Sequence, residues 1–167
     1  MLVLQIIQQG TCMIKLILLI VLVLLIMIVA KYISQQYKDR YRIYCDIVDF
    51  FDNYKLNVGF KKEKLKSLIK DYTDKATVLG SYNNFLATGK FDLSSVKLLT
   101  AQEKSQLKEY FVKLGNGDYE TEKNLIEIAK AYFNSKVEET KKIKDKWCPL
   151  IIKLTFLFAL GVAILFI

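Results

Sequence analysis

Five lysines lie close together in the middle of the chain, and their side chains are the ones best suited to binding a ligand. They are Lys61, Lys62, Lys64, Lys66 and Lys70. A basic run of this kind is a solvated helix face or a surface for an acidic protein, lipid headgroups or nucleic acid. No aromatic residue lies among these lysines, as it would in a platform for stacked bases, so we expect no nucleic acid. We therefore favour two interpretations of the five lysines: a solvated helix face, or a surface that binds an acidic partner protein.

Three aspartates recur at every third position, which is one way to arrange oxygen ligands for a cation. However, Asp46, Asp49 and Asp52 would spread their carboxylates around a helix, and no glycine-kinked loop encloses an ion as in an EF-hand. We therefore expect an exposed acidic face and no metal site. Three glutamates near the start of the last predicted helix are explained by the helix dipole: Glu120, Glu122 and Glu127.

The composition argues against catalysis. The chain has no histidine, which removes Ser-His-Asp and Cys-His nucleophile pairs, histidine-ligated zinc and an imidazole proton shuttle. Its three widely spaced cysteines do not make a thiolate metal site or a disulfide framework. Residues 114–117 (LGNG) lack the Gly-Lys-Ser/Thr ending of a phosphate-binding loop. We assign no catalytic residue, cofactor site or metal site, and we expect the protein not to be an enzyme.

Two apolar blocks are long enough to cross a bilayer, which requires about 20 residues in a helix. Residues 16–30 carry no polar side chain, and together with the residues before them they predict a transmembrane helix at 12–30. Residues 147–167 contain a single charge, Lys153, and predict a second transmembrane helix. Residues 1–11 are then a short external N-terminal segment.

Basic residues set the predicted orientation. Four of them follow the first span, at positions 31 to 42, and five lysines at 136–146 precede the second span. Lysine and arginine favour the cytosolic side, whereas acidic residues contribute little. We therefore expect a two-pass protein of the cell membrane, with residues 31–146 facing the cytosol and both termini outside. A cleaved signal peptide is disfavoured, because Ile28 stands three positions before a cleavage point after Ala30, where a small residue is needed.

The predicted fold class is all-α, with a cytosolic helical-bundle domain at 31–146 between an N-terminal and a C-terminal transmembrane helix. Apolar positions at helical spacing predict two long helices. The first stripe is Ile33, Tyr37, Tyr41, Tyr44, Val48 and Phe51. The second stripe is Ile126, Ala129, Phe133, Val137, Thr140, Lys144 and Trp147. Because each helix adjoins a membrane span, the two are expected to run side by side and antiparallel.

Shorter helices are predicted at 61–72 and at 74–87, followed by another after Thr100. Local capping chemistry marks their ends. The signals are a break at 57–59, a cap at Asp74, a stop at Gly89, a turn opened by Asp92 or Ser94, a capping box from Thr100 to Glu103, a left-handed cap at Gly115 and a cap at Asp118. The domain is therefore expected to pack as several short helices against the two long ones.

A series of motifs runs through residues 99–147. It consists of Leu99-Thr100-Ala101-Gln102-Glu103, Leu107, Phe111 and residues 114–118 (LGNGD), before a long basic helix and the last span. With an N-terminal span and a helical domain of this size, the chain resembles the stage III sporulation protein AB family of endospore-forming bacteria. Two departures are Glu122, where the family has a glutamine, and Cys148-Pro149, where it has a glycine.

The resemblance implies a domain like the cytosolic helical domain of the type II secretion inner-membrane platform protein. It also implies a non-enzymatic component of a secretion-like membrane complex between mother cell and forespore. The expected partners are the lipid bilayer, other subunits of that complex and a cytosolic ATPase on the mother-cell side. Association into a homo-oligomer is left open.

Two alternatives to a sporulation component remain. One is a membrane-anchored adaptor or scaffold unrelated to sporulation, which would present the same basic helical domain. The other is a holin-like pore former. This alternative is disfavoured because neither span has a polar face.

Overall fold

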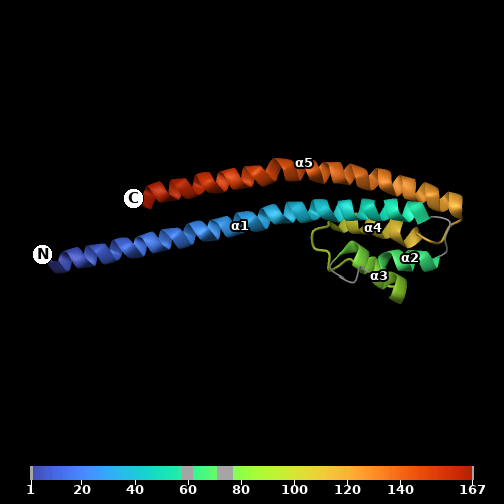
Figure 1. Ribbon diagram of the computed structural model, residues 1–167, viewed down its shortest axis with the longest axis horizontal. Helices are drawn as coiled ribbons and strands as arrows, with labels where there is room; N and C mark the ends of the chain where they lie inside the picture. Colours follow the sequence, from blue (N-terminus) through green and yellow to red (C-terminus); the bar gives the residue numbers. More distant parts are fainter. Residues whose placement is uncertain (1, 58–61, 71–76, 167) are drawn as a thin grey trace. The chain divides into compact units, whose positions relative to one another are not determined.

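The computed structural model describes residues 2–57, 62–70 and 77–166. Within these ranges every regular element is a helix and there is no strand, so the predicted all-α fold is confirmed. The helices are α1 (Leu2–Asn57), α2 (Lys62–Ile69), α3 (Val78–Thr88), α4 (Ala101–Lys113) and α5 (Tyr119–Phe166) (Figure 1). The chain divides into two compact units. We call Met1–Tyr37 with Ile143–Ile167 the terminal unit, and Lys38–Lys142 the central unit.

The terminal unit exposes most of its large apolar side chains. Among them are Ile17, Leu18, Leu24, Leu25, Ile28, Ile152, Phe156, Leu157 and Phe158. Among the described residues one helical segment, Ile17–Leu56, is long and apolar enough to cross a membrane, with a mean hydropathy of 2.9 in its most apolar window. The same measure identifies no such segment in the described part of α5, so the second span at 147–167 stays a prediction.

The two helices of the terminal unit meet at small side chains. Ala30 and Ser34 lie one turn apart on α1 and are 8% and 4% exposed, and Cys148 on α5 is 8% exposed. The Cys148 thiol donates to the backbone carbonyl of Ser34 at 3.5 Å. Small residues four positions apart let two helix backbones approach closely. By contrast Trp147, which the predicted stripe placed on the packed face, is 41% exposed, so that part of the prediction is wrong.

The central unit is held together by a core of stacked aromatic rings. Phe51 of α1 lies 5.5 Å from Phe111 of α4 and 5.6 Å from Phe133 of α5, measured between ring centroids. Tyr82 of α3 packs edge-on against Phe111 at 4.7 Å. Such pairs add roughly 0.5–1.5 kcal/mol each to the free energy gained by burying the rings. The core therefore links α1, α3, α4 and α5.

In the central unit α1 and α5 run antiparallel, as the sequence predicts. Asp52 pairs with Lys130, and Lys55 pairs with Glu127 at 2.6 Å, so residue numbers rise on one helix as they fall on the other. The buried face of α1 is wider than the predicted stripe. It includes Tyr44, Ile47, Phe50, Phe51 and Tyr54, whereas Ile33 is 39% exposed. The reason is that α1 is packed by more than one helix, so side chains on two adjacent rows are buried.

Three predicted caps are confirmed. At the start of α4 the Thr100 hydroxyl accepts from the Glu103 amide at 3.3 Å, and the Glu103 carboxylate accepts from the Thr100 amide at 2.8 Å. After α4, Gly115 adopts the left-handed conformation with φ 75°. At the start of α5 the Asp118 carboxylate accepts from the Thr121 amide at 2.9 Å. These short-range hydrogen bonds fix where the two helices begin and where α4 ends.

The prediction for the start of α3 is wrong. Its N-cap is Thr77, whose hydroxyl accepts from the Gly80 amide at 3.0 Å, whereas the predicted cap, Asp74, lies outside the described residues. Aspartate and threonine are both good N-caps, so the sequence offers two starting points within one turn. The helix ends as predicted at Gly89, which has φ 75°.

Candidate functional site

The predicted basic surface lies partly on α2. Lys62 and Lys64 are residues of this helix, and Lys61 lies outside the described residues. Lys66 and Lys70 are exposed. On the other face of α2, Leu65 and Ile69 are 2% and 0% exposed and Leu68 is half-buried. Apolar side chains of α2 therefore lie in the core, while Lys66 and the following Lys70 lie in solvent, and the role of this surface in binding a partner stays a prediction.

Lys66 and Lys70 border an open hollow of about 390 Å³ between α2 and α3. Leu86 and Ala87 of α3 supply its apolar side. Two ammonium groups beside a small apolar surface can hold an anionic group without any covalent chemistry. This hollow is the only part of the predicted surface whose side chains can be placed in the described structure.

The aspartate row on α1 faces solvent. Asp46, Asp49 and Asp52 are all exposed, and Asp52 forms an ion pair with Lys130. Partial burial raises the pKa of Asp46 from its ordinary value, and the charge of Arg42 opposes this rise. Among the described residues no group of three His, Cys, Asp or Glu side chains is placed to hold a metal ion.

Glu103 is a buried carboxylate that joins α4 to α1. One of its oxygens accepts from the Arg40 guanidinium at 2.7 Å, while the other accepts from Thr100. Burial alone would raise the pKa of Glu103, but the hydrogen bonds from Thr100 and the charge of Arg40 outweigh it and hold the pKa below its ordinary value. An ionised carboxylate whose two oxygens are used in this way has a structural role.

Tyr44 lies beside this carboxylate and is 1% exposed. Burial, and then the interaction of its hydroxyl with the Glu103 carboxylate, raise the pKa of Tyr44 well above its ordinary value. The hydroxyl therefore stays protonated at neutral pH and does not act as a base.

Glu122 forms a second buried link, between α1 and the turn that precedes α5. It is 6% exposed, its carboxylate accepts from the Tyr54 hydroxyl at 3.2 Å, and it accepts from the Gly117 amide at 3.0 Å. The interaction with the helix dipole predicted for Glu122 does not account for this contact. A signal was present, because Glu122 precedes the buried Ile126 and Ala129 at spacings of four and three, which places it on the core face of α5.

The two hollows and the two buried carboxylates occupy different places in the fold. The hollow beside α2 and a second one beside α4 are lined, in the described part of the chain, by lysine, serine, asparagine and apolar residues. Glu103 and Glu122 line neither hollow and instead hold helices together.

The chain matches no protein-family model, no curated protein and no solved structure. The resemblance of residues 99–147 to the stage III sporulation protein AB family therefore stays a prediction, and it rests on those residues alone.

Proposed function

We propose that this protein is a non-enzymatic, integral-membrane component of a multi-protein assembly, in which the helical domain binds partner proteins. The observation that carries the proposal is the length of α1. This one helix contains an apolar segment with exposed side chains and continues without a break into the aromatic core of the central unit. A helix of this kind suits a domain whose chain continues directly from a membrane anchor.

The proposal includes a second span at 147–167. Support comes from the exposed apolar residues of α5, such as Ile152, Phe156 and Leu157, which are 60%, 68% and 71% exposed. Contact of these side chains with the lipid tails of a bilayer has no free-energy cost, whereas their exposure to water is unfavourable. Residues 31–146 then face the cytosol, with the basic flanks on that side and both termini outside.

The particular assembly we propose is the stage III sporulation complex between mother cell and forespore, with a cytosolic ATPase and further membrane subunits as partners. The support is the motif series at 99–147. Within it the Thr100–Glu103 capping box is a structural element of α4, and Glu103 also bonds Arg40 of α1. An adaptor unrelated to sporulation would use the same anchor and domain, and only the identity of the partner separates the two functions.

The test is purification of the tagged full-length chain in mild detergent from sporulating cells of its source. We expect the secretion-type ATPase encoded beside its gene to co-purify, and we expect deletion of the gene to abolish heat-resistant spores. A gene neighbourhood without such an ATPase, together with normal spore counts in the deletion strain, would overturn the sporulation assignment.

The predicted basic surface is tested in the same purification. Charge reversal at Lys61, Lys62 and Lys64 should release the ATPase if that surface is the contact. Retention of the ATPase by this variant would reject the surface and leave the assembly role standing.

A further inference from the structure

A second open groove, of about 300 Å³, runs beside α4. Its helical wall consists of Ala101, Lys104, Ser105 and Lys108. Their spacing of three, one and three residues places them on one face of α4. The opposite face carries the buried Glu103, Leu107 and Phe111, so α4 has one side in the core and the other along the groove.

The floor of the groove is apolar and held in place. It contains Phe91 and Leu93, and Leu93 is 6% exposed. The Phe91 ring lies 6.0 Å from the ring of Phe111 in the core. Beside the floor, the Asp92 carboxylate accepts from the Ser94 amide at 2.8 Å and closes a tight turn. Because the groove is already formed, a ligand would not have to order it on binding.

The groove has an excess of positive charge. Lys104 and Lys108 form no ion pair with another described residue. The neighbouring Glu109 is engaged elsewhere, because it pairs with Lys113 at 2.8 Å. One carboxylate beside the groove, Asp92, interacts with the charge of Lys104. An occupant with matching chemistry is therefore acidic, with an apolar group for the floor.

We propose that this groove binds an acidic segment of a partner protein, in which a bulky apolar side chain lies between carboxylates. The two lysines are one helical turn apart, about 6 Å between their Cβ atoms. Carboxylates one turn apart on a helix, or two residues apart on a strand, span a similar distance. A flat layer of lipid headgroups would reach the lysines but would leave the apolar floor unfilled. The proposal rests on the proposed function, since it gives the chemistry of the partner for the same domain.

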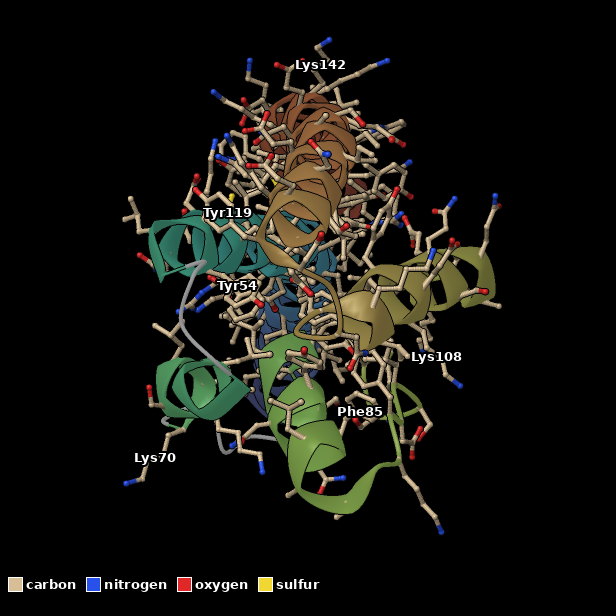
Figure 2. The ribbon with its side chains drawn as sticks, turned by 90° about the vertical axis from the view of Figure 1, so that its right-hand side faces the viewer. Tyr54, Lys70, Phe85, Lys108, Tyr119 and Lys142 are labelled. Atoms are coloured by element: carbon tan, nitrogen blue, oxygen red, sulfur yellow. The ribbon has the colours of Figure 1, made fainter. Side chains whose placement is uncertain are left out.

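The groove is a different surface from the predicted one on α2. Figure 2 shows Lys70 and Lys108 on either side of α3, the helix that carries Phe85. Lys142 and Lys146 are exposed, line neither hollow and are four residues apart, as are Lys104 and Lys108. The chain therefore contains a matched pair of lysines for a control with the same change in net charge.

The experiment uses the full-length chain in detergent and a fluorescein-labelled peptide, Glu-Glu-Leu-Phe-Glu-Glu, followed by fluorescence anisotropy. The double variant Lys104→Glu/Lys108→Glu should weaken binding by about tenfold or more, because two attractive contacts become repulsive. The double variant Lys142→Glu/Lys146→Glu makes the same change in net charge outside both hollows, and it should weaken binding by less than about twofold. Ser105→Trp fills the groove without changing charge, and it should also remove binding.

Several results would overturn the proposal. One is equal weakening by both charge-reversal variants, which would mean that net charge alone attracts the peptide. Another is undiminished binding of a peptide with two alanines in place of Leu-Phe, which would mean that the floor is unused. No binding by the wild-type chain, with its helical circular dichroism intact, would also reject it.

Two further results distinguish the peptide site from lipid binding and from the proposed assembly role. Loss of binding to anionic phosphatidylglycerol nanodiscs in Lys104→Glu/Lys108→Glu, with unchanged peptide binding, would assign the lysines to lipid and overturn the peptide site. If the peptide fails to bind while the ATPase still co-purifies with the wild-type chain, the groove assignment falls and the assembly role stands.

Discussion

The two units place the same kinds of side chain in opposite environments. In the terminal unit Leu24 and Leu25 are 53% and 55% exposed, whereas in the central unit Leu65 and Leu107 are 2% and 1% exposed. Contiguous apolar surface on this scale is rare on proteins that live in water alone. The difference is what a chain would show with one part in a bilayer and the other in water.

The two units also differ in the hydrogen bonding of their buried polar groups. The central unit holds Glu103 and Glu122 in its interior, and each carboxylate accepts at least two hydrogen bonds. In the terminal unit the buried Ser34 hydroxyl has no partner among the described residues. Polar links therefore define the packing of the central unit, while small side chains allow the contact in the terminal unit.

The largest expected effect comes from putting acid into the exposed apolar part of α1. Each aspartate at the centre of a span costs about 3 kcal/mol of insertion free energy, so Leu24→Asp/Leu25→Asp should lose about 6 kcal/mol. The first span should then fail to insert, so a cysteine introduced as Gln8→Cys should no longer react with a membrane-impermeant maleimide in intact cells. The control is Leu56→Asp, since Leu56 is 81% exposed at the other end of α1, and it should leave this labelling unchanged. Labelling of Gln8→Cys in the double variant would remove the contrast between the units.

Truncation of a central ring should have the next largest effect. Phe111 is 0% exposed and contacts rings from α1 and α3. Phe111→Ala should lower the free energy of unfolding of the central unit by about 3–5 kcal/mol through lost burial and a cavity. Urea unfolding followed by near-ultraviolet circular dichroism measures this. The neighbouring Val112→Ala, at a site that is 37% exposed, should change it by less than about 0.5 kcal/mol.

Loss of a buried carboxylate should cost less than loss of a ring. Glu122→Ala leaves the Tyr54 hydroxyl and the Gly117 amide without their acceptor, so we expect a loss of about 1–3 kcal/mol. Glu120→Ala, at an exposed site two residues earlier, should cost about 0.5 kcal/mol or less. Equal effects in the same urea titration would mean that Glu122 acts only on the helix dipole.

The smallest expected effect is the pH dependence that Glu103 contributes. Its pKa is lowered in the folded protein from an ordinary value of 4.5, so the folded state is stabilised above that pH. The stabilisation is lost as pH falls below 4.5 through the folded pKa. In Glu103→Gln the free energy of unfolding should therefore fall less steeply as the pH is lowered from neutral to the acid transition.

A control for this prediction is Glu109→Gln. Glu109 forms an exposed ion pair with Lys113 four residues away, which is worth about 0.3–0.5 kcal/mol. In this variant the free energy of unfolding should depend on acid pH as it does in the wild-type protein. If Glu103→Gln also shows the wild-type pH dependence, the Glu103–Arg40 ion pair makes no measurable contribution to stability.

Helix ends were predictable where the information is local. The Thr100–Glu103 box, Gly115 and Asp118 act through hydrogen bonds or backbone angles within a few residues, and all three are confirmed. The start of α3 was not predictable, because Asp74 and Thr77 compete and the winner depends on packing.

Burial was predictable only in outline. The stripe on α1 correctly includes Tyr44 and Phe51, yet it omits Ile47 and Phe50, since the number of helices that cover α1 is a tertiary property. The groove beside α4 was not predictable from the sequence for the same reason. Lys104 and Lys108 lie on one helix face in the sequence, but only the folded chain brings the Phe91–Leu93 floor beside them.

The central claim, a two-pass hairpin with a cytosolic domain, is tested most directly by cysteine labelling in intact cells. In a chain with Cys12, Cys45 and Cys148 replaced by serine, single cysteines are introduced as Gln8→Cys, Ser135→Cys and Ile167→Cys. A membrane-impermeant maleimide should label the first and third in intact cells, and Ser135→Cys only after permeabilisation. Labelling of Ile167→Cys only after permeabilisation would place the C-terminus in the cytosol and contradict the two-pass topology.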